Sequence, residues 1–158
     1  MTLFDTSTMP VQKRPNYQQQ YREQQLKKLG APEDWTQSEI PTLNGESRIV
    51  LNAETQGVQW WGGDKPIGWA YWFPESGRHG YLGMRHEGGG NHPVERVHEF
   101  LRDVRGVQVC NANTKFDIHM AREDGVDLVE QGNCFRDVMH DAALLDDHRR
   151  QSLRRLIK

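Results

Sequence analysis

Two short segments carry side chains whose oxygen atoms are suited to binding a divalent cation. The first is Asn52-Ala53-Glu54-Thr55 and the second runs from Asn113 to Asp117; each offers one carboxylate and one amide. Hard cations such as Mg²⁺ prefer several oxygen ligands, above all anionic ones. Two such cations about 3.5 to 4 Å apart promote phosphodiester hydrolysis, one by generating hydroxide and the other by stabilising the leaving oxygen. Glu54 and Asp117 are the carboxylates that the two segments would offer to such chemistry, and neither short pattern is specific for it alone.

The pattern of apolar residues predicts the elements that position these segments. Ile49-Val50-Leu51 is a short, continuous apolar run, which predicts a central strand that is covered on both faces and ends at Asn52. A strand over Val107 to Cys110 precedes the second segment, and a helix from Phe116 to Glu123 begins within that segment. Strand ends and helix starts converge at one edge of such a sheet, so we expect the two segments to lie close together.

Further patterns complete one α/β domain. Residues 67–73 alternate with a period of two, and a turn at Pro74 to Gly77 leads to a strand near Tyr81 to Met84, which predicts an antiparallel pair. The resulting order is three strands and then helix, strand, helix, strand, helix, which predicts an α/β fold with a mixed five-stranded sheet and flanking helices. The remaining predicted elements are a helix that Pro93 begins and Gly106 ends, a strand Cys134-Phe135-Arg136, a helix capped by Asp137, and a last helix from Ser152.

The beginning of the chain differs from this domain. Residues 1–45 read as a flexible arm, in which Asn16 to Leu29 is rich in glutamine and forms one weakly amphipathic helix that stops at Gly30-Ala31-Pro32. The sequence of this arm is compatible both with docking on a neighbouring domain and with disorder. Residues 46–158 form the predicted domain.

Composition excludes several classes of protein. The net charge of −2 argues against nucleic-acid binding through bulk positive charge, so any such binding must be local. No apolar run is long enough to cross a bilayer and no secretory signal opens the chain, so we expect a cytoplasmic protein without a membrane partner. Two cysteines, Cys110 and Cys134, are too few for a disulfide scaffold and are predicted to be reduced, packed thiols.

The two segments resemble the motifs of one nuclease family. In the DnaQ-like 3'-5' exonuclease domains, and most closely in the proofreading domains of family A DNA polymerases, the first motif is Asp-x-Glu-Thr. The second is Asn-x-x-x-Asp with an aromatic residue before the aspartate, as Phe116 precedes Asp117 here. Asp137-Val138-Met139 and the stretch that follows it are similar to the family's connecting segment. The resemblance covers residues 48–158 and implies an RNase H-like fold and a phage or bacterial source.

The resemblance also implies roles for individual residues. Asn52, Glu54 and Asp117 occupy catalytic, metal-binding positions for two Mg²⁺ or Mn²⁺ ions. Thr55, Val58 and Asn113 match positions that contact the last nucleotide, with Val58 as an apolar wedge against the base. The implied substrate is the 3' end of single-stranded DNA, and the implied partner is a polymerase domain in the same parent chain.

Two departures from the family pattern bear on activity. Asn52 replaces the family's aspartate, keeping a carbonyl oxygen but losing the charge, and we expect severe loss of catalysis with the fold largely kept. The family's third motif, Tyr-x-x-x-Asp or His-x-x-x-x-Asp, is not found after Ser152. The expectation is therefore a truncated exonuclease domain that lacks its final helices and has a weakened metal site.

Two other functions stay open on the sequence. One is a catalytically dead exonuclease-fold module that binds nucleic acid or a protein, which Asn52 favours if it is the inherited residue. The other is an RNase D-like 3'-5' exoribonuclease. Trp60 and Trp61, just after the first motif, are open to two interpretations, a lining of the substrate groove or ordinary packing.

Overall fold

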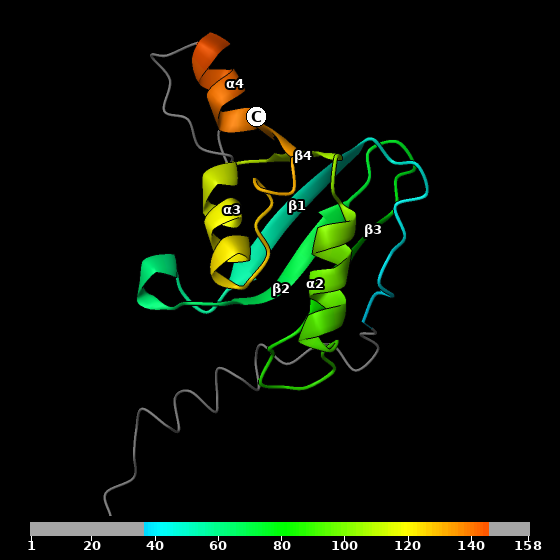
Figure 1. The fold of residues 1–158 in the computed structure, drawn as a ribbon, viewed down its shortest axis with the longest axis vertical. Coiled ribbons are helices and arrows are strands. Elements are labelled where there is room, and N and C mark those ends of the chain that lie inside the picture. The colour runs from blue at the N-terminus through cyan, green and yellow to red at the C-terminus, as the bar shows by residue number, and fades with distance from the viewer. Residues whose placement is uncertain (1–36, 146–158) are drawn as a thin grey trace, which may run out of the picture. The chain divides into compact units, whose positions relative to one another are not determined.

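The fold is a mixed five-stranded sheet with helices packed against it. The computed structural model describes residues 37–145, which belong to one compact unit of the chain, Thr36–Lys158. The strands lie in the order β3-β2-β1-β4-β5, with β1 in the middle (Figure 1). This confirms the predicted α/β class and is compatible with an RNase H-like fold.

Strand β1, Arg48–Thr55, buries one of its two faces. Its buried residues alternate, and they are Ile49, Leu51 and Ala53, whereas Val50 and Asn52 are only partly covered. The prediction of a central strand is confirmed. The prediction of cover on both faces is wrong for the described residues, because α2 (Val94–Asp103) and α3 (Thr114–Glu123) contribute to the same hydrophobic cluster on one side of the sheet.

Strands β2, Pro66–Trp72, and β3, His79–Gly83, form the antiparallel half of the sheet. β2 pairs with β1 on one side and with β3 on the other, with Ala53 opposite Trp69 and Trp69 opposite Leu82. The turn that joins them contains Gly77 at a φ of 73°, a left-handed conformation that glycine adopts without steric cost. The predicted meander of three strands is therefore present.

Strands β4, Gln108–Asn111, and β5, Cys134–Asp137, form the parallel half. β4 pairs with β1 from Arg48 opposite Gln108 to Val50 opposite Cys110, and β5 pairs with the other side of β4. Both cysteines are free; Cys110 is partly covered, but Cys134 is exposed rather than packed as predicted, because β5 is an edge strand.

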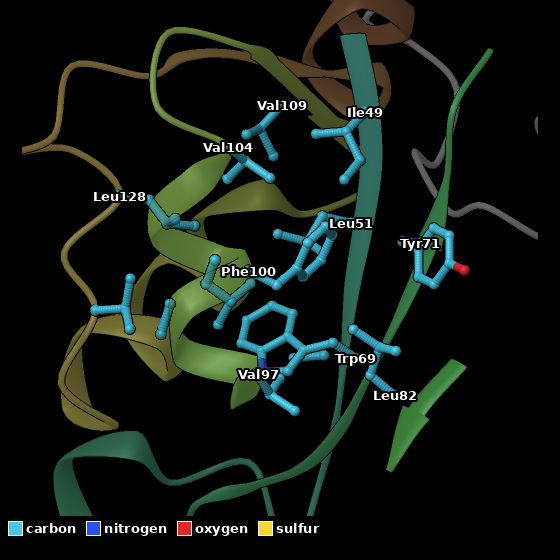
Figure 2. Close-up of a cluster of buried hydrophobic side chains, with 14 of the residues drawn as sticks. Ile49, Leu51, Trp69, Tyr71, Leu82, Val97, Phe100, Val104, Val109 and Leu128 are labelled. Carbon is cyan, nitrogen blue, oxygen red and sulfur yellow. The ribbon is translucent and has the colours of Figure 1, made fainter. Parts of the chain in front are cut away.

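The hydrophobic core lies between the sheet and α2. Figure 2 shows Val97, Phe100 and Val104 directed from the helix toward Ile49, Leu51 and Trp69 on β1 and β2. All six are essentially inaccessible to solvent. Burial of this many large apolar side chains is the main favourable contribution to folding.

The helices begin and end near the predicted residues. Pro93 precedes α2, which stops ahead of Gly106 at a φ of 75°. α4 spans Val138–Leu145, and Met139 N–H donates to Oδ1 of Asp137 at 2.9 Å, which confirms the predicted cap. The predicted helix from Asn16 to Leu29 and the one from Ser152 lie outside the described residues, and the domain boundary at residue 46 stays a prediction.

Within residues 37–145, no helix is both long and apolar enough to cross a membrane.

A buried charge network joins three parts of the fold. The carboxylate of Asp124, at the C-terminal end of α3, accepts hydrogen bonds from both terminal nitrogens of Arg85 at 3.0 and 2.8 Å and lies 2.8 Å from Nε2 of His98 on α2. Arg85 also donates to the carbonyl of Pro66 at the start of β2. The Asp124 side chain is only 5% exposed, so its partners replace the water that the charge has lost.

We predict that Asp124→Ala lowers the free energy of unfolding by about 3 kcal/mol, because the largely covered Arg85 guanidinium loses its partner. Urea denaturation followed by circular dichroism measures the change. Glu99→Ala is the control, since it breaks the solvent-exposed ion pair with Arg96 and should cost less than about 1 kcal/mol. Equal losses in the two variants would contradict a structural role for the network.

Candidate functional site

The candidate site forms where β1 and β4 separate. The last residues paired through the backbone are Val50 and Cys110. Beyond them, two side chains form hydrogen bonds with backbone N–H and C=O groups on the edge of β1 that faces β4. Nδ2 of Asn111 donates to the Leu51 carbonyl at 2.6 Å, and the Ala53 N–H donates to Oδ1 of Asp117 at 2.8 Å. Side chains thus continue the hydrogen bonding that the backbone of β4 no longer provides.

Asp117 brings the two sequence segments together. It lies in the first turn of α3, is 3% exposed, and binds the residue between Asn52 and Glu54, from which it is separated by 64 positions in the chain. Its second oxygen, Oδ2, accepts a hydrogen bond from Nδ2 of Asn111 at 2.5 Å. The expected proximity of the two segments is therefore what the structure shows.

Asn111 is a site residue that the sequence pattern did not single out. Its amide nitrogen bridges Leu51 and Asp117, and its Oδ1 accepts from the N–H of Ala112 at 2.8 Å. The side chain is buried, with all its hydrogen bonds directed to this junction. A polar residue directly after the predicted strand was the available signal, but such residues more often begin a turn.

Asn52 and Glu54 lie on the sheet face opposite the core. Because side chains alternate along a strand, the two point the same way from β1, and Nδ2 of Asn52 donates to Oε1 of Glu54 at 3.2 Å. The amide therefore offers a hydrogen-bond donor to the carboxylate. An aspartate at position 52 would instead place a second negative charge beside Glu54, an arrangement that a cation stabilises.

Asn113 and Asp137 define the start of α3. Asn113 precedes the helix with a φ of 61°, is exposed, and makes no side-chain capping hydrogen bond. The Asp137 carboxylate instead accepts from the N–H groups of Asn113 and Thr114, at 3.1 and 2.9 Å, in addition to that of Met139. One side chain thus holds the first turns of α3 and α4, a favourable place for a carboxylate because helix N-termini are electropositive. The Asn113 side chain is left available for a ligand.

Thr55 and Val58 lie at the end of β1 and in the loop that follows. The Thr55 hydroxyl donates to the Gly57 carbonyl at 2.6 Å, so it closes a local turn. Val58 is 68% exposed. Of the two predicted nucleotide contacts, Val58 presents free apolar surface, while the Thr55 hydroxyl is engaged within the chain.

Burial governs the electrostatics of Asp117. Removal from water raises the pKa of its carboxyl from 3.8 to about 7, against the hydrogen bonds from Ala53 and Asn111, which favour the charged form. Tyr81 on β3 is affected similarly: burial raises its pKa to about 12, and the negative charge of Glu54 adds to the effect. The Tyr81 hydroxyl also lies 2.6 Å from Nε2 of His86. Tyr81 is therefore a neighbour of Glu54 that the motifs did not indicate, and His86 is the hydrogen-bonding partner of Tyr81.

The residues present do not fit a pair of divalent cations. In the described part of the chain, no three His, Cys, Asp or Glu side chains are grouped so that they could share a metal ion. Glu54 is hydrogen-bonded to a neutral amide, and both oxygens of Asp117 are engaged within the protein. Position 52 contributes a neutral amide, so Glu54 has no second carboxylate beside it on this face of β1.

Comparison with known proteins relates the chain to phage DNA polymerases. It is 31% identical over 119 residues to a DNA-directed DNA polymerase of Pseudomonas phage M6, an alignment covering 66% of this chain and 18% of that protein. It is 29% identical over 111 residues to DNA polymerase DpoZ of Acinetobacter phage SH-Ab 15497, and 31% identical over 111 residues to DNA polymerase DpoZ of Salmonella phage PMBT28; each alignment covers 69% of this chain and 16% of the relative.

The chain therefore spans less than a fifth of the length of these polymerases. No family model matches it. The similarity confirms the predicted relation to phages and to DNA polymerases, at the level of a polymerase-related domain.

The raised pKa of Asp117 predicts how stability depends on pH. The folded chain holds this proton more tightly than the unfolded chain, so the contribution of the neutral carboxyl is fully present below about pH 4 and is lost as pH rises to about 7. Urea denaturation in metal-free buffer across this range should show the free energy of unfolding falling relative to that of Asp117→Asn, which does not titrate there. Parallel curves for the two proteins would contradict this prediction.

Proposed function

We propose that this chain is a 3'-5' exonuclease-type domain of a phage DNA polymerase, of the DnaQ-like kind, in a form with severely reduced catalysis. One observation carries the proposal: the hydrogen bond from Ala53 N–H to Asp117, at 2.8 Å, joins the two motif segments at the carboxyl end of the central strand. The similarity to phage DNA polymerases supports the same conclusion.

The position of the site in the sheet supports a catalytic origin. β1 and β4 run parallel, so their carboxyl ends lie at one edge, where Asn52, Glu54 and Asn111 follow the paired residues. Ligand sites of open α/β sheets form at such edges, because loops and helix starts from different strands converge there. The start of α3, which carries Asn113 and Asp117, lies at this edge as well.

The proposed substrate is the 3' end of single-stranded DNA. The residues present do not fit a metal pair; with a carboxylate at position 52, a bound pair of Mg²⁺ or Mn²⁺ ions would supply hydroxide and stabilise the leaving oxygen. Glu54 and Asp117 are the anionic ligands that this chain offers. Val58 would contact the terminal base through its exposed side chain, and Asn113 would bind near the terminal nucleotide. The expected partner is the polymerase domain of the parent chain.

A second function is favoured by the hydrogen bond between Asn52 and Glu54. Because the amide satisfies the carboxylate without a cation, the folded site is stable in its metal-free form. A domain in that state would bind a DNA strand, or a partner protein, without cleaving it. The two functions differ in one testable property, whether restoring a carboxylate at position 52 restores metal binding.

We predict that Asn52→Asp increases both metal affinity and hydrolysis. Binding of Mn²⁺, measured by titration calorimetry, should tighten, because the new carboxylate lies beside that of Glu54 on the same face of β1. Release of mononucleotides from a 3'-labelled single strand should rise by about 100-fold or more in Mg²⁺, since metal stabilisation of the transition state contributes several kcal/mol.

Two variants control this experiment. Asn52→Ala should gain neither property, and the double variant Asn52→Asp with Glu54→Gln should lose what the single variant gained. If Asn52→Asp gains neither Mn²⁺ affinity nor hydrolysis while its circular dichroism spectrum is unchanged, the exonuclease proposal is wrong. DNA binding that persists in that case would support the binding-only function. Faster release from a matched RNA strand would instead indicate an exoribonuclease.

A further inference from the structure

An exposed tryptophan lies in the loop that follows the first motif. The short 3-10 helix η1, Trp60–Gly62, comes directly after Val58. Trp61 is 68% exposed, as is Val58, so two large apolar side chains of one loop face solvent. Neither belongs to the hydrophobic core.

Trp60 holds Trp61 in place. The Trp60 ring stacks on that of His119 in α3, with centroids 4.7 Å apart and planes 6° apart, and it meets Phe116 edge to face at 6.1 Å. Trp61 in turn meets Trp60 at 4.5 Å with the rings nearly perpendicular. Trp61 is therefore supported by a stack that ends on α3, while most of its own surface remains open.

The loop is also fixed by its own backbone contacts. Oδ2 of Asp64 accepts from the N–H of Gln59 at 2.8 Å, and the N–H of Gly63 donates to the carbonyl of Trp60 at 3.2 Å. At Gly57 an added Cβ would lie 2.2 Å from Oδ2 of Asp64, so only glycine allows the carboxylate to pack this closely. The exposed indole is thus presented by a preformed loop, which reduces the entropy lost when a ligand binds.

Charge and position favour a nucleic-acid ligand over an apolar protein surface. Lys115 is exposed and lies one turn before His119, the residue that stacks on Trp60, so the two side chains project from the same side of α3. The same helix carries Asp117 at the candidate site. A strand whose end reaches that site would have phosphates near Lys115 and bases near the ring of Trp61.

We propose that Trp61 is a stacking site for a base of single-stranded DNA, with Trp60 and His119 as the side chains that position it. The inference rests on the proposed function only for the identity of the ligand. Stacking on an indole does not depend on base identity, which suits a domain that must accept any sequence. Val58 would contact the terminal base and Trp61 a base in the same strand.

Binding of a fluorescein-labelled oligothymidylate, measured by fluorescence anisotropy in EDTA, tests the proposal without cleavage. Trp61→Ala should raise the dissociation constant by about tenfold or more, the effect of losing one stacked base. Trp61→Phe should retain most of the affinity because the aromatic face remains. Val129→Ala is the matched control, since Val129 is an exposed apolar residue, 47% accessible, in the loop that precedes β5.

A direct measurement locates the contact. Oligothymidylate carrying 5-iodouracil should, on irradiation, crosslink to Trp61, identified by mass spectrometry of the peptides. Failure of the natural chain to bind the oligonucleotide, or equal affinity in Trp61→Ala and the natural chain, would overturn the proposal. A folded Trp61→Ala chain, checked by circular dichroism, is required for the comparison.

The outcome is separable from that of the exonuclease proposal. Hydrolysis restored by Asn52→Asp, together with unchanged DNA binding in Trp61→Ala, would support the exonuclease proposal and contradict the stacking proposal. Weaker DNA binding in Trp61→Ala with no hydrolysis in Asn52→Asp would support the stacking proposal and the function of a domain that binds DNA without cleaving it.

Discussion

The hydrogen bond between the backbone of Ala53 and the carboxylate of Asp117 is the contact on which the site depends. It lies where β1 and β4 diverge, and it supplies a partner for a backbone N–H that the parallel strand no longer reaches. Asn111 does the same for the carbonyl of Leu51. These two side chains fix the start of α3 against the central strand, and so they determine where both motif segments lie. Without them, β1 would leave unpaired backbone groups in a largely buried place.

The burial of Asp117 that this contact requires opposes the negative charge that a metal ligand needs. A carboxylate that is 3% exposed is costly to ionise, and burial accordingly raises its pKa to about 7. A divalent cation would reverse that cost by favouring the charged form. With Asn52 in place of an aspartate, the chain offers hydrogen bonds in this region rather than added negative charge. The site therefore offers a cation fewer anionic ligands than a carboxylate at position 52 would give.

The similarity to phage DNA polymerases gives this arrangement a context. The aligned region is a small part of each polymerase, which agrees with one domain of a larger enzyme. The loop after β1 exposes the apolar side chains of Val58 and Trp61, which would add ligand contacts to those of the two carboxylates. The stack from Trp61 through Trp60 to His119 connects that loop to the helix that carries Asp117.

The sequence by itself determined the class of fold, the strand order along the chain and the two segments that meet. Periodicity of apolar residues is a local property, and it was enough to predict β1 through β5, α2 and α3, while the residue type at the start of α4 predicted the cap by Asp137. The tertiary structure alone decided that β1 is covered on one face, that Asn111 belongs to the site, and that Trp60 stacks on His119. Each of these depends on residues distant in the sequence being brought together, and on the point at which β1 and β4 part. No local pattern specifies that point, because the hydrogen bonds made there join Asn111 and Asp117 to residues of β1 about 60 positions away in the chain.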